Sequence, residues 1–454
     1  MALIAIVAIC FSSCKKTPNN KEPKITMTSA QAAMKYIQGM MKEYYFWNET
    51  APYPNYMNYS VVELFFKESL VKQDRWSWMS DGKSYMASET GVYTSYGASL
   101  GQAHEYYRDA TVYIRYVFKD SPFDKAGITR GWSIEKINGV NTMDLIKNDK
   151  FNDEYNKDGN TFTFKDTAGN LKEMKINKSS IQATSILKAM VFDKKDYPWL
   201  SEPVGYINYL SFNINMIEEV KSAVAVVKTS GAKHLILDLR YNGGGSIKAS
   251  DLLASLIANK GCNGKLLVKR KHNSKYSALD NDKKTMSFIQ RTTESLDLDD
   301  IYVISGHGTA SASEIIINGL KPLMNVIQVG QTTYGKPNGM YVLQYPPDIP
   351  KNKIPDYVFL PICFYSVNSL GKGDFDNGLA PDHYRADRPN CDWTDDDLVV
   401  ACLKKIATGS YPELPKVTTT KVVSIRPDAV IQTDEQKPGY GLCIADMPVE
   451  KHIN

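Results

Sequence analysis

The chain has 454 residues, with 54 lysines and arginines against 50 aspartates and glutamates, and a formal net charge of +4. This even balance lacks the basic surface that binding to a polyanion requires, so nucleic acid is not an expected partner. The chain is too long to fold around one ordinary hydrophobic core. Hydrophobic residues make up 43% of it, which is enough for conventional globular cores. We therefore expect about two to four domains.

The first 13 residues form an apolar run that is too short to span a bilayer and reads as the core of a secretory signal peptide. The run ends in Ser12-Ser13-Cys14, which resembles a bacterial lipobox in which Cys14 becomes the lipidated first residue. Cys10 fits this pattern less well because Ile9 precedes it, and no basic residues open the run. An ordinary cleaved signal or a frayed apolar N-terminus is the alternative interpretation.

If Cys14 is lipidated, residues 14–28 form a tether to the membrane. We then expect a lipoprotein of the cell envelope that faces the periplasm or the outer surface.

Between residues 29 and 82, apolar and aromatic residues recur at the spacing of α-helices. The turn Ala51-Pro52-Tyr53-Pro54-Asn55 separates two helices. This pattern predicts a small helical domain that serves packing or docking and carries no chemistry.

Residues 83–180 change to a pattern of short strands. Val112–Phe118 alternates between apolar and polar residues, and residues 162–164 and 172–176 flank a turn of Asp, Ala, Gly and Asn residues. We expect a small β domain that ends near residue 180.

Residues 181–410 alternate between buried strands and apolar helices, which predicts strand–helix units on one sheet. One strand, His234–Leu239, ends at Gly243-Gly244-Gly245 before an apolar helix. Another strand, Ile301–Ile304, leads through a turn of small residues into a second helix, and Val326–Val329 is the next strand. The basic run Lys269–His272 lies between these units, where we expect a solvated loop.

Ser311 and Lys336 are the polar residues of interest in this region. Ser311 opens the second helix, where unpaired backbone N–H groups favour negative charge. Lys336 lies in the loop after the next strand, 336 − 311 = 25 residues further on. A serine and a lysine in this arrangement can act as nucleophile and base, although serine is also a common helix cap.

The three consecutive glycines at 243–245 allow the main chain to approach a ligand closely and to adopt positive φ. An oxyanion hole built from main-chain N–H groups needs such a segment. A purely structural turn is the alternative.

Taken together, three runs resemble the carboxy-terminal processing proteases, a family of Ser–Lys serine peptidases. They are DLRYNGGG at 238–245, TASASE at 309–314 and TYGK at 333–336, and GDFDNGLAPD at 373–382 resembles a further segment of the family. The resemblance implies that Ser311 is the nucleophile and Lys336 the general base. It also implies an oxyanion hole from the N–H groups of Ala312 and of Gly243 or Gly244.

The same resemblance implies a multi-domain α+β chain, in which the helical domain and a PDZ-like β domain at 83–180 precede a crotonase- or ClpP-like α/β peptidase domain at 181–410. The runs SPFDKAG at 121–127 and GWSIEKING at 131–139 resemble a PDZ domain. Such domains bind the C-termini of polypeptides through backbone N–H groups. The candidate cradle is Tyr96-Gly97-Ala98-Ser99-Leu100, which matches the usual loop loosely and can also be structural only.

One position departs from the family pattern. Many members carry a glutamine four residues after the lysine, where this chain has Met340. Asn338 and Gln331 are the remaining candidates for orienting Lys336.

Three functions compete on this pattern: a Ser–Lys endopeptidase, a catalytically silent peptide- or ligand-binding lipoprotein on the same fold, and an acyl-CoA enzyme of the crotonase type. Retention of both Ser311 and Lys336 favours the first. The exported N-terminus and the PDZ-like segment disfavour the third. A Ser–His–Asp arrangement with His383 and Asp382 has no local signature.

The sequence predicts no metal or cofactor, because the histidines are scattered and the cysteines lack the spacing of metal ligands. Residues 411–454 contain no motif, and we assign them no role. Nothing in the sequence indicates an oligomeric state.

Overall fold

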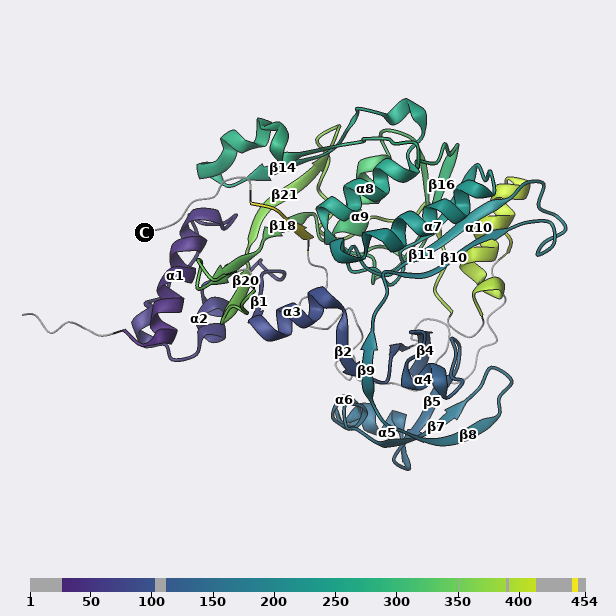
Figure 1. Cartoon of the computed structure of the whole chain (residues 1–454), viewed down its shortest axis with the longest axis horizontal. Helices are drawn as coiled ribbons and strands as arrows, with labels where there is room; N and C mark the ends of the chain where they lie inside the picture. The colour runs from purple at the N-terminus through teal and green to yellow at the C-terminus, as the bar shows by residue number, and fades with distance from the viewer. Residues whose placement is uncertain (1–26, 103–111, 351, 389–391, 414–442, 448–454) are drawn as a thin grey trace, which may run out of the picture.

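The computed structural model describes residues 27–102, 112–350, 352–388, 392–413 and 443–447 (Figure 1). The predicted signal peptide, Cys14 and nearly all of the tether lie outside these ranges. No helix within the described ranges is long and apolar enough to cross a membrane.

The N-terminal segment forms helices where the apolar spacing predicts them. Helix α1 (Ser29–Tyr44) begins with a capping box between Thr28 and Gln31, and a second helix, α2 (Val62–Glu68), follows a short 3-10 turn, η1 (Tyr56–Asn58). The apolar faces of both helices belong to the same hydrophobic core as the large sheet described below. The N-terminal helices are thus packed onto the rest of the chain.

A three-stranded sheet joins this segment to the C-terminal half. Strand β1 (Trp78–Asp81) pairs with β20 (Tyr357–Leu360), which pairs with β19 (Leu343–Tyr345). Helix α3 (Gly82–Thr90) follows β1, although the sequence pattern predicts short strands from residue 83. The helix forms because Asp81 caps its start by accepting from Ser84 N at 3.0 Å, and Gly91, at φ 68°, ends it.

The small β unit (residues 96–176) hangs below the main body on a two-stranded ribbon of β2 (Val92–Ser95) and β9 (Ser179–Gln182) (Figure 1). Its own core is rich in aromatic rings, with Phe123 packed edge-on against Phe162 and Phe164. Its sheet has the order β3-β4-β5-β7-β8, with β6 beside β5, so β3 is an edge strand. The strands are β3 (Ala98–Gln102), β4 (Val112–Val117), β5 (Ser133–Ile137), β6 (Val140–Asn141), β7 (Asn160–Lys165) and β8 (Leu171–Ile176), and the helices are α4 (Pro122–Lys125), α5 (Thr142–Lys147) and α6 (Phe151–Tyr155).

The large sheet has the order β10-β11-β12-β16-β17-β22, and every neighbouring pair except β10–β11 is parallel. Successive residues of a strand point to opposite faces, so Leu235 and Leu237 of β12 pack on one side and Ile236 on the other. Both faces are covered by helices, which explains the continuous apolar runs of the sequence.

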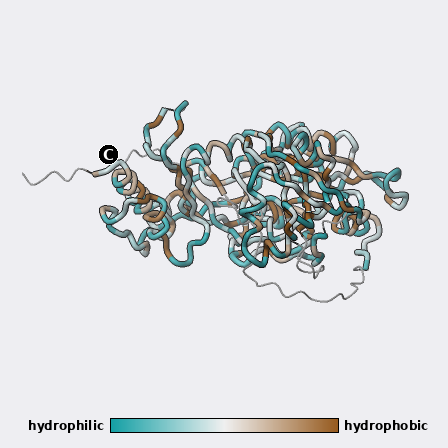
Figure 2. Tube along the Cα trace, turned by 90° about the horizontal axis from the view of Figure 1, so that it is seen from below, coloured by the Kyte–Doolittle hydropathy of each residue, from teal (hydrophilic) through white to brown (hydrophobic). Residues whose placement is uncertain are grey.

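Helices α7, α8 and α9 cover one face of the large sheet and α10 covers the other. Along the chain trace, apolar segments concentrate inside this body (Figure 2). The elements are β10 (Ile186–Phe192), β11 (Val204–Tyr209), η2 (Ile214–Met216), α7 (Ile217–Thr229), β12 (His234–Asp238), α8 (Ile247–Ile257), β16 (Asp300–Ser305), α9 (Ala312–Leu320), β17 (Asn325–Gly330), β22 (His383–Tyr384), η6 (Trp393–Asp395) and α10 (Asp397–Thr408).

A second sheet has the order β13-β23-β18-β21-β14-β15. Its strands are β13 (Gly245–Ser246), β23 (Cys443–Ala445), β18 (Asn338–Tyr341), β21 (Ile362–Asn368), β14 (Leu266–His272) and β15 (Met286–Phe288), and the 3-10 turns η3 (Lys260–Cys262), η4 (Ser274–Asn281) and η5 (Lys283–Thr285) lie nearby in the chain. The sheet therefore includes a short strand from the C-terminal tail.

The prediction of a solvated loop at Lys269–His272 is wrong, since this run lies in β14. Arg270 and His272 are each only 9% exposed, whereas Lys271 faces solvent. His272 lies between Asp280 and the Tyr341 hydroxyl, at 2.9 and 2.7 Å. Successive side chains of a strand point to opposite faces, so Arg270 and His272 point into the protein and Lys271 points out.

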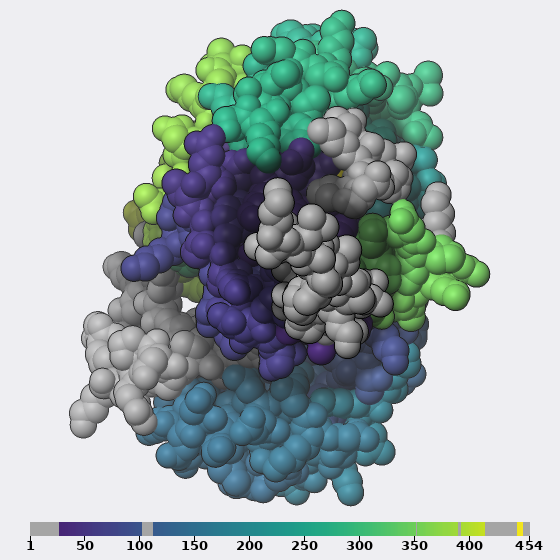
Figure 3. Space-filling model, turned by 90° about the vertical axis from the view of Figure 1, so that its left-hand side faces the viewer, coloured from purple at the N-terminus to yellow at the C-terminus, as the bar shows by residue number. Residues whose placement is uncertain are grey.

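The N-terminal helices lie between the segment containing η4 above and the small β unit below (Figure 3). Asn273, at the start of η4, donates to the carbonyls of Glu43 and Tyr45 at 3.0 and 2.9 Å. These contacts fix the end of α1 against the second sheet.

Candidate active site

Three loops at the carboxyl ends of β12, β16 and β17 carry the glycines, Ser311 and Lys336. Because parallel strands end at the same edge of a sheet, the loops converge. Hydrogen bonds join the first two: Thr309 Oγ1 donates to Leu239 O at 2.8 Å, Ala310 N donates to Asn242 O at 3.0 Å, and Ser313 Oγ donates to the same carbonyl at 3.0 Å. The serine turn is therefore held against the glycine loop.

Ser311 has a strained backbone. Its φ of 62° and ψ of −114° lie outside the regions that side-chain-bearing residues normally adopt. The hydroxyl is completely buried and lies beside the Cys443 thiol. A buried hydroxyl on a strained turn at the start of a helix is an arrangement typical of nucleophilic serines.

Glu314 connects the serine turn to the lysine loop. Its carboxylate accepts from Ser311 N at 2.7 Å and from the backbone N–H groups of Gly335 and Lys336, each at 2.8 Å, and from Thr333 Oγ1 at 2.5 Å. Burial raises the pKa of Glu314, and these donors oppose the rise. The single buried carboxylate of Glu314 thus holds the backbones of both candidate catalytic residues.

Lys336 is 1% exposed. Burial lowers the pKa of its amine from the ordinary 10.5 to about 8, against weaker opposing effects of Cys443, Asp74 and Glu314. The Nζ atom donates to the Met340 sulfur at 3.7 Å. Met340, which occupies the position where many of the resembled proteases carry glutamine, therefore contacts the Lys336 amine. Within the described part of the chain, this amine donates to neither Asn338 nor Gln331.

The candidate oxyanion donors lie beside Ser311. A Cβ built on Gly244 would meet Ser311 Cβ at 2.8 Å and Ala312 N at 3.0 Å, so only glycine fits there. The Gly244 N–H, however, donates to Asn242 Oδ1 at 2.8 Å. Ala312 N opens helix α9 and has no acceptor within the helix. Of the predicted donors, Ala312 and Gly243 therefore remain for an oxyanion.

Cys443 is a site residue that sequence reasoning missed. The tail strand, defined as Cys443–Ala445 (β23), runs between β13 and β18, and the Cys443 thiol lies close to Ser311 and Lys336. Burial raises the pKa of this thiol, while Lys336 and the Ser311 hydroxyl lower it. No sequence signal marks this strand, because it is short and isolated in a segment without a motif.

A buried network of charges supports the glycine loop from below. Arg240 donates to Asp238 at 2.7 Å and to Asp396 at 2.9 Å, and Arg130 of the small β unit donates to Asp396 at 2.8 Å. Arg130 also donates to the Tyr241 hydroxyl at 2.8 Å. The network therefore joins the small β unit to the loop that carries Gly243.

The predicted cradle at residues 96–100 is only partly available for a ligand. The Tyr96 ring is completely buried and stacks on Phe123 with a centroid distance of 5.3 Å. The Gly97 N–H donates to Ser95 Oγ at 3.0 Å. Ala98, Ser99 and Leu100 belong to β3, which is the outermost strand of this sheet among the described residues.

The alternative triad partners are engaged elsewhere. The His383 ring stacks on Tyr411 at 3.7 Å between centroids, and Asp382 pairs with Lys321 at 3.7 Å. In the part of the chain that the structure describes, no group of three or more histidine, cysteine or acidic side chains could hold a metal ion.

The chain is similar to known proteins over most of its length. The model of peptidase family S41 matches residues 203–359, and that of the peptidase S41 N-terminal domain matches residues 32–78. A protein of Staphylococcus epidermidis named as a probable CtpA-like serine protease is 22% identical over 336 residues, which cover 74% of this chain and 62% of the relative. One of the same name from Staphylococcus aureus is 24% identical, over 74% of this chain and 61% of its own. This chain thus spans about three fifths of these curated relatives.

Among solved structures, a protein of Bacteroides fragilis named for the S41 proteases has the same fold. Its TM-score is 0.62 at 20% sequence identity, over 83% of this chain and 97% of its own.

Proposed function

Because this chain belongs to peptidase family S41, we propose that it is a serine endopeptidase in which Ser311 attacks polypeptide substrates and Lys336 is the general base. The observation that carries the proposal is the buried Ser311 hydroxyl on a strained turn, linked through Glu314 to a buried lysine with a lowered pKa.

The lowered pKa makes Lys336 competent as a base. With a pKa of about 8, about a tenth of the amines are neutral at pH 7, whereas at the ordinary value almost none are. The neutral amine accepts the proton of Ser311 as Oγ attacks the scissile carbonyl. The N–H groups of Ala312 and Gly243 then stabilise the oxyanion, typically by about 3–4 kcal/mol for each donor. The lysine ammonium protonates the leaving amine, and water hydrolyses the acyl-enzyme with Lys336 again as base.

The experiment is cleavage of an unfolded polypeptide reporter by purified protein. We expect internal cuts that require Ser311 and that zinc chelators leave unaffected. A Ser311→Ala variant with unchanged activity would refute the proposal.

Replacing Met340 with glutamine should shift the acidic limb of the pH–rate profile to higher pH. A thioether is a weak acceptor, whereas an amide oxygen stabilises the lysine ammonium and so raises the pKa of Lys336. We expect the limb to rise by about one unit in Met340→Gln and not to rise in Met340→Leu, which keeps a similar volume. The measurement is kcat/KM from pH 6 to 10, and an unshifted limb in Met340→Gln contradicts the predicted contact.

Substrate recognition in this proposal involves the small β unit acting as a PDZ-like domain. An extended peptide that adds to edge strand β3 would gain main-chain hydrogen bonds. Arg130 and Tyr241 give this unit a direct connection to the glycine loop.

The proposed setting is the cell envelope. The lipobox-like run that ends at Cys14 supports a lipid-anchored form exported across the inner membrane. Polypeptides of that compartment would be the substrates.

A further inference from the structure

The tail strand fills a strand position next to Ser311. Cys443 and Ile444 pair in parallel with Gly245 and Ser246 of β13, and Ile444 and Ala445 pair in parallel with Met340 and Tyr341 of β18. Strand β13 continues directly from the glycine loop, and β18 follows the loop that carries Lys336. The tail strand therefore lies between the backbones that present the two halves of the candidate active site.

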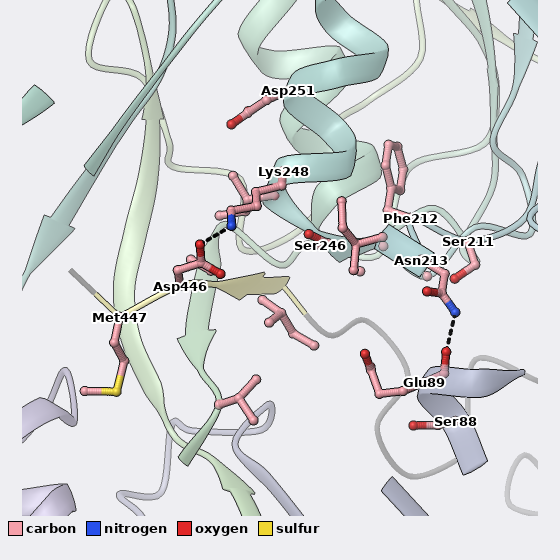
Figure 4. A pocket seen from close by; sticks show the side chains of 18 of the residues that line it. Ser88, Glu89, Ser211, Phe212, Asn213, Ser246, Lys248, Asp251, Asp446 and Met447 are labelled. Carbon is pink, nitrogen blue, oxygen red and sulfur yellow. Dashed lines mark hydrogen bonds and ion pairs between the residues drawn. The ribbon is translucent and has the colours of Figure 1, made fainter. Parts of the chain in front are cut away.

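The two faces of the tail strand meet different surroundings. Cys443 and Ala445 are buried, at 1% and 6% exposure, and Cys443 Sγ lies 3.2 Å from the position of a Cβ built on Gly339. Residues 444–447 line a cavity of about 830 Å³ that the glycine loop also borders, whereas Cys443 does not line it. Figure 4 shows Met447 and the Lys248–Asp446 ion pair beside this cavity.

The tail strand leaves no room for a substrate at Ser311. Ser311 is 0% exposed and Lys336 1%, and the Cys443 thiol lies beside the Ser311 hydroxyl and near enough to Lys336 to interact with its charge. A scissile carbonyl must contact the Ser311 oxygen and the N–H groups of Ala312 and Gly243. The polypeptide and Cys443 cannot both occupy this space.

The contacts that hold the tail strand are few. It has two registered residue pairs with each neighbour. The ion pair between Lys248 and Asp446, the residue that follows the tail strand, is 64% and 69% exposed, and ion pairs exposed to this degree contribute little. A competing strand with better side-chain contacts could therefore replace it.

We propose that the tail strand is a resident competitor that occupies the strand position of the polypeptide substrate and must leave before Ser311 reacts. The inference rests on the proposed function and adds a substrate preference to it. A displacing peptide is extended, places a small uncharged side chain against Gly339, where Cys443 now lies, and directs an apolar side chain into the cavity, as Ile444 does. Because the tail is tethered, it competes at a high effective concentration.

The test removes the tail strand and returns it as a separate peptide. The first variant lacks residues 443–454. The second, Ala445→Asp in the full chain, expels the tail by placing a charge at a buried position. Asp446→Asn is the matched control, because it changes a charge on the same segment at an exposed site. Reporter cleavage and thermal unfolding are measured for each variant.

Binding is measured without catalysis. A fluorescein-labelled peptide of residues 441–449, Gly-Leu-Cys-Ile-Ala-Asp-Met-Pro-Val, is titrated into Ser311→Ala protein with and without residues 443–454, and a scrambled peptide serves as reference. We expect binding to the truncated protein and at least tenfold weaker binding to the full chain. We also expect the truncation and Ala445→Asp to raise kcat/KM about tenfold or more, with Asp446→Asn unchanged.

The failures are distinguishable. Peptide binding to the truncated protein, with no reporter cleaved by any variant, supports the resident competitor and refutes the peptidase. Equal cleavage by all variants with no peptide binding refutes the competitor alone. A lower unfolding temperature and lower activity in both tail variants, again with no peptide binding, would show that β23 is an ordinary structural strand and overturn the inference.

Discussion

Replacing Lys336 with methionine should abolish polypeptide cleavage and at the same time make the protein more stable. Lys336 is 1% exposed, and its amine donates to the Met340 sulfur, which is a weak acceptor. A shift of its pKa from 10.5 to about 8 corresponds to about 3 kcal/mol of native-state cost for holding the charge at pH 7. Methionine fills the site without that cost, and cleavage should fall about a thousandfold or more because the base is lost.

The pH dependence of stability provides an independent test of the lowered pKa of Lys336. Between pH 8 and 10.5 the unfolded chain holds more protons on Lys336 than the folded chain does, so the free energy of unfolding should rise with pH across this window. This increment should be missing in Lys336→Met. Urea denaturation at pH 7 and pH 10 measures it.

Two further variants control this prediction. Lys336→Arg should be as inactive as Lys336→Met but less stable, because guanidinium stays charged when buried. Ser311→Ala should be inactive with stability close to that of the parent. Wild-type turnover in Lys336→Met, or a large loss of its stability, would contradict the assignment of a buried base.

Replacing Asp396 with alanine should destabilise the fold more than any surface change. Its carboxylate accepts from Arg130 and Arg240 and also caps α10, with Leu398 N at 3.0 Å. Removing it leaves two buried guanidiniums short of a partner, for which the expected loss is about 3–5 kcal/mol, plus about 1 kcal/mol for the cap. Chemical denaturation followed by tryptophan fluorescence measures the loss.

The control for Asp396 is Lys221→Ala, which breaks an exposed pair with Glu218 at 2.7 Å within α7. Such an exposed pair contributes little to stability, and alanine favours the helix, so we expect almost no loss. A similar, small loss in both variants would show that the buried network does not stabilise the fold. A loss confined to Asp396→Ala would also show that this network holds the small β unit against the large sheet, because Arg130 belongs to the small β unit.

The convergence of the three loops could be predicted from the sequence because each lies directly after a buried apolar strand. Ser311, Lys336 and the glycines follow β16, β17 and β12 in this way. Glu314 could also have been found, since Ser311-x-x-Glu314 has the spacing of a capping box. Its bonds to the lysine loop could not, because they depend on tertiary packing.

The errors have identifiable causes. Lys269–His272 was assigned by charge, although alternation with period two would have predicted a strand that buries Arg270 and His272. Helix α3 was missed because its cap at Asp81 and its ending at Gly91 are local signals inside a region with a β pattern. Cys443 was beyond prediction, because a three-residue strand owes its place to its neighbours and not to its own propensity.

The most direct test of the Ser–Lys assignment is the rate at which a fluorophosphonate labels Ser311 as a function of pH, in the parent protein and in Lys336→Met. The tail strand slows both proteins alike, so the comparison isolates the base. We predict that the parent's rate rises through an apparent pKa near 8 and that the adduct maps to Ser311, while Lys336→Met reacts slowly at every pH. Labelling of Lys336→Met at the parent's rate, or an adduct on another residue, would contradict the account.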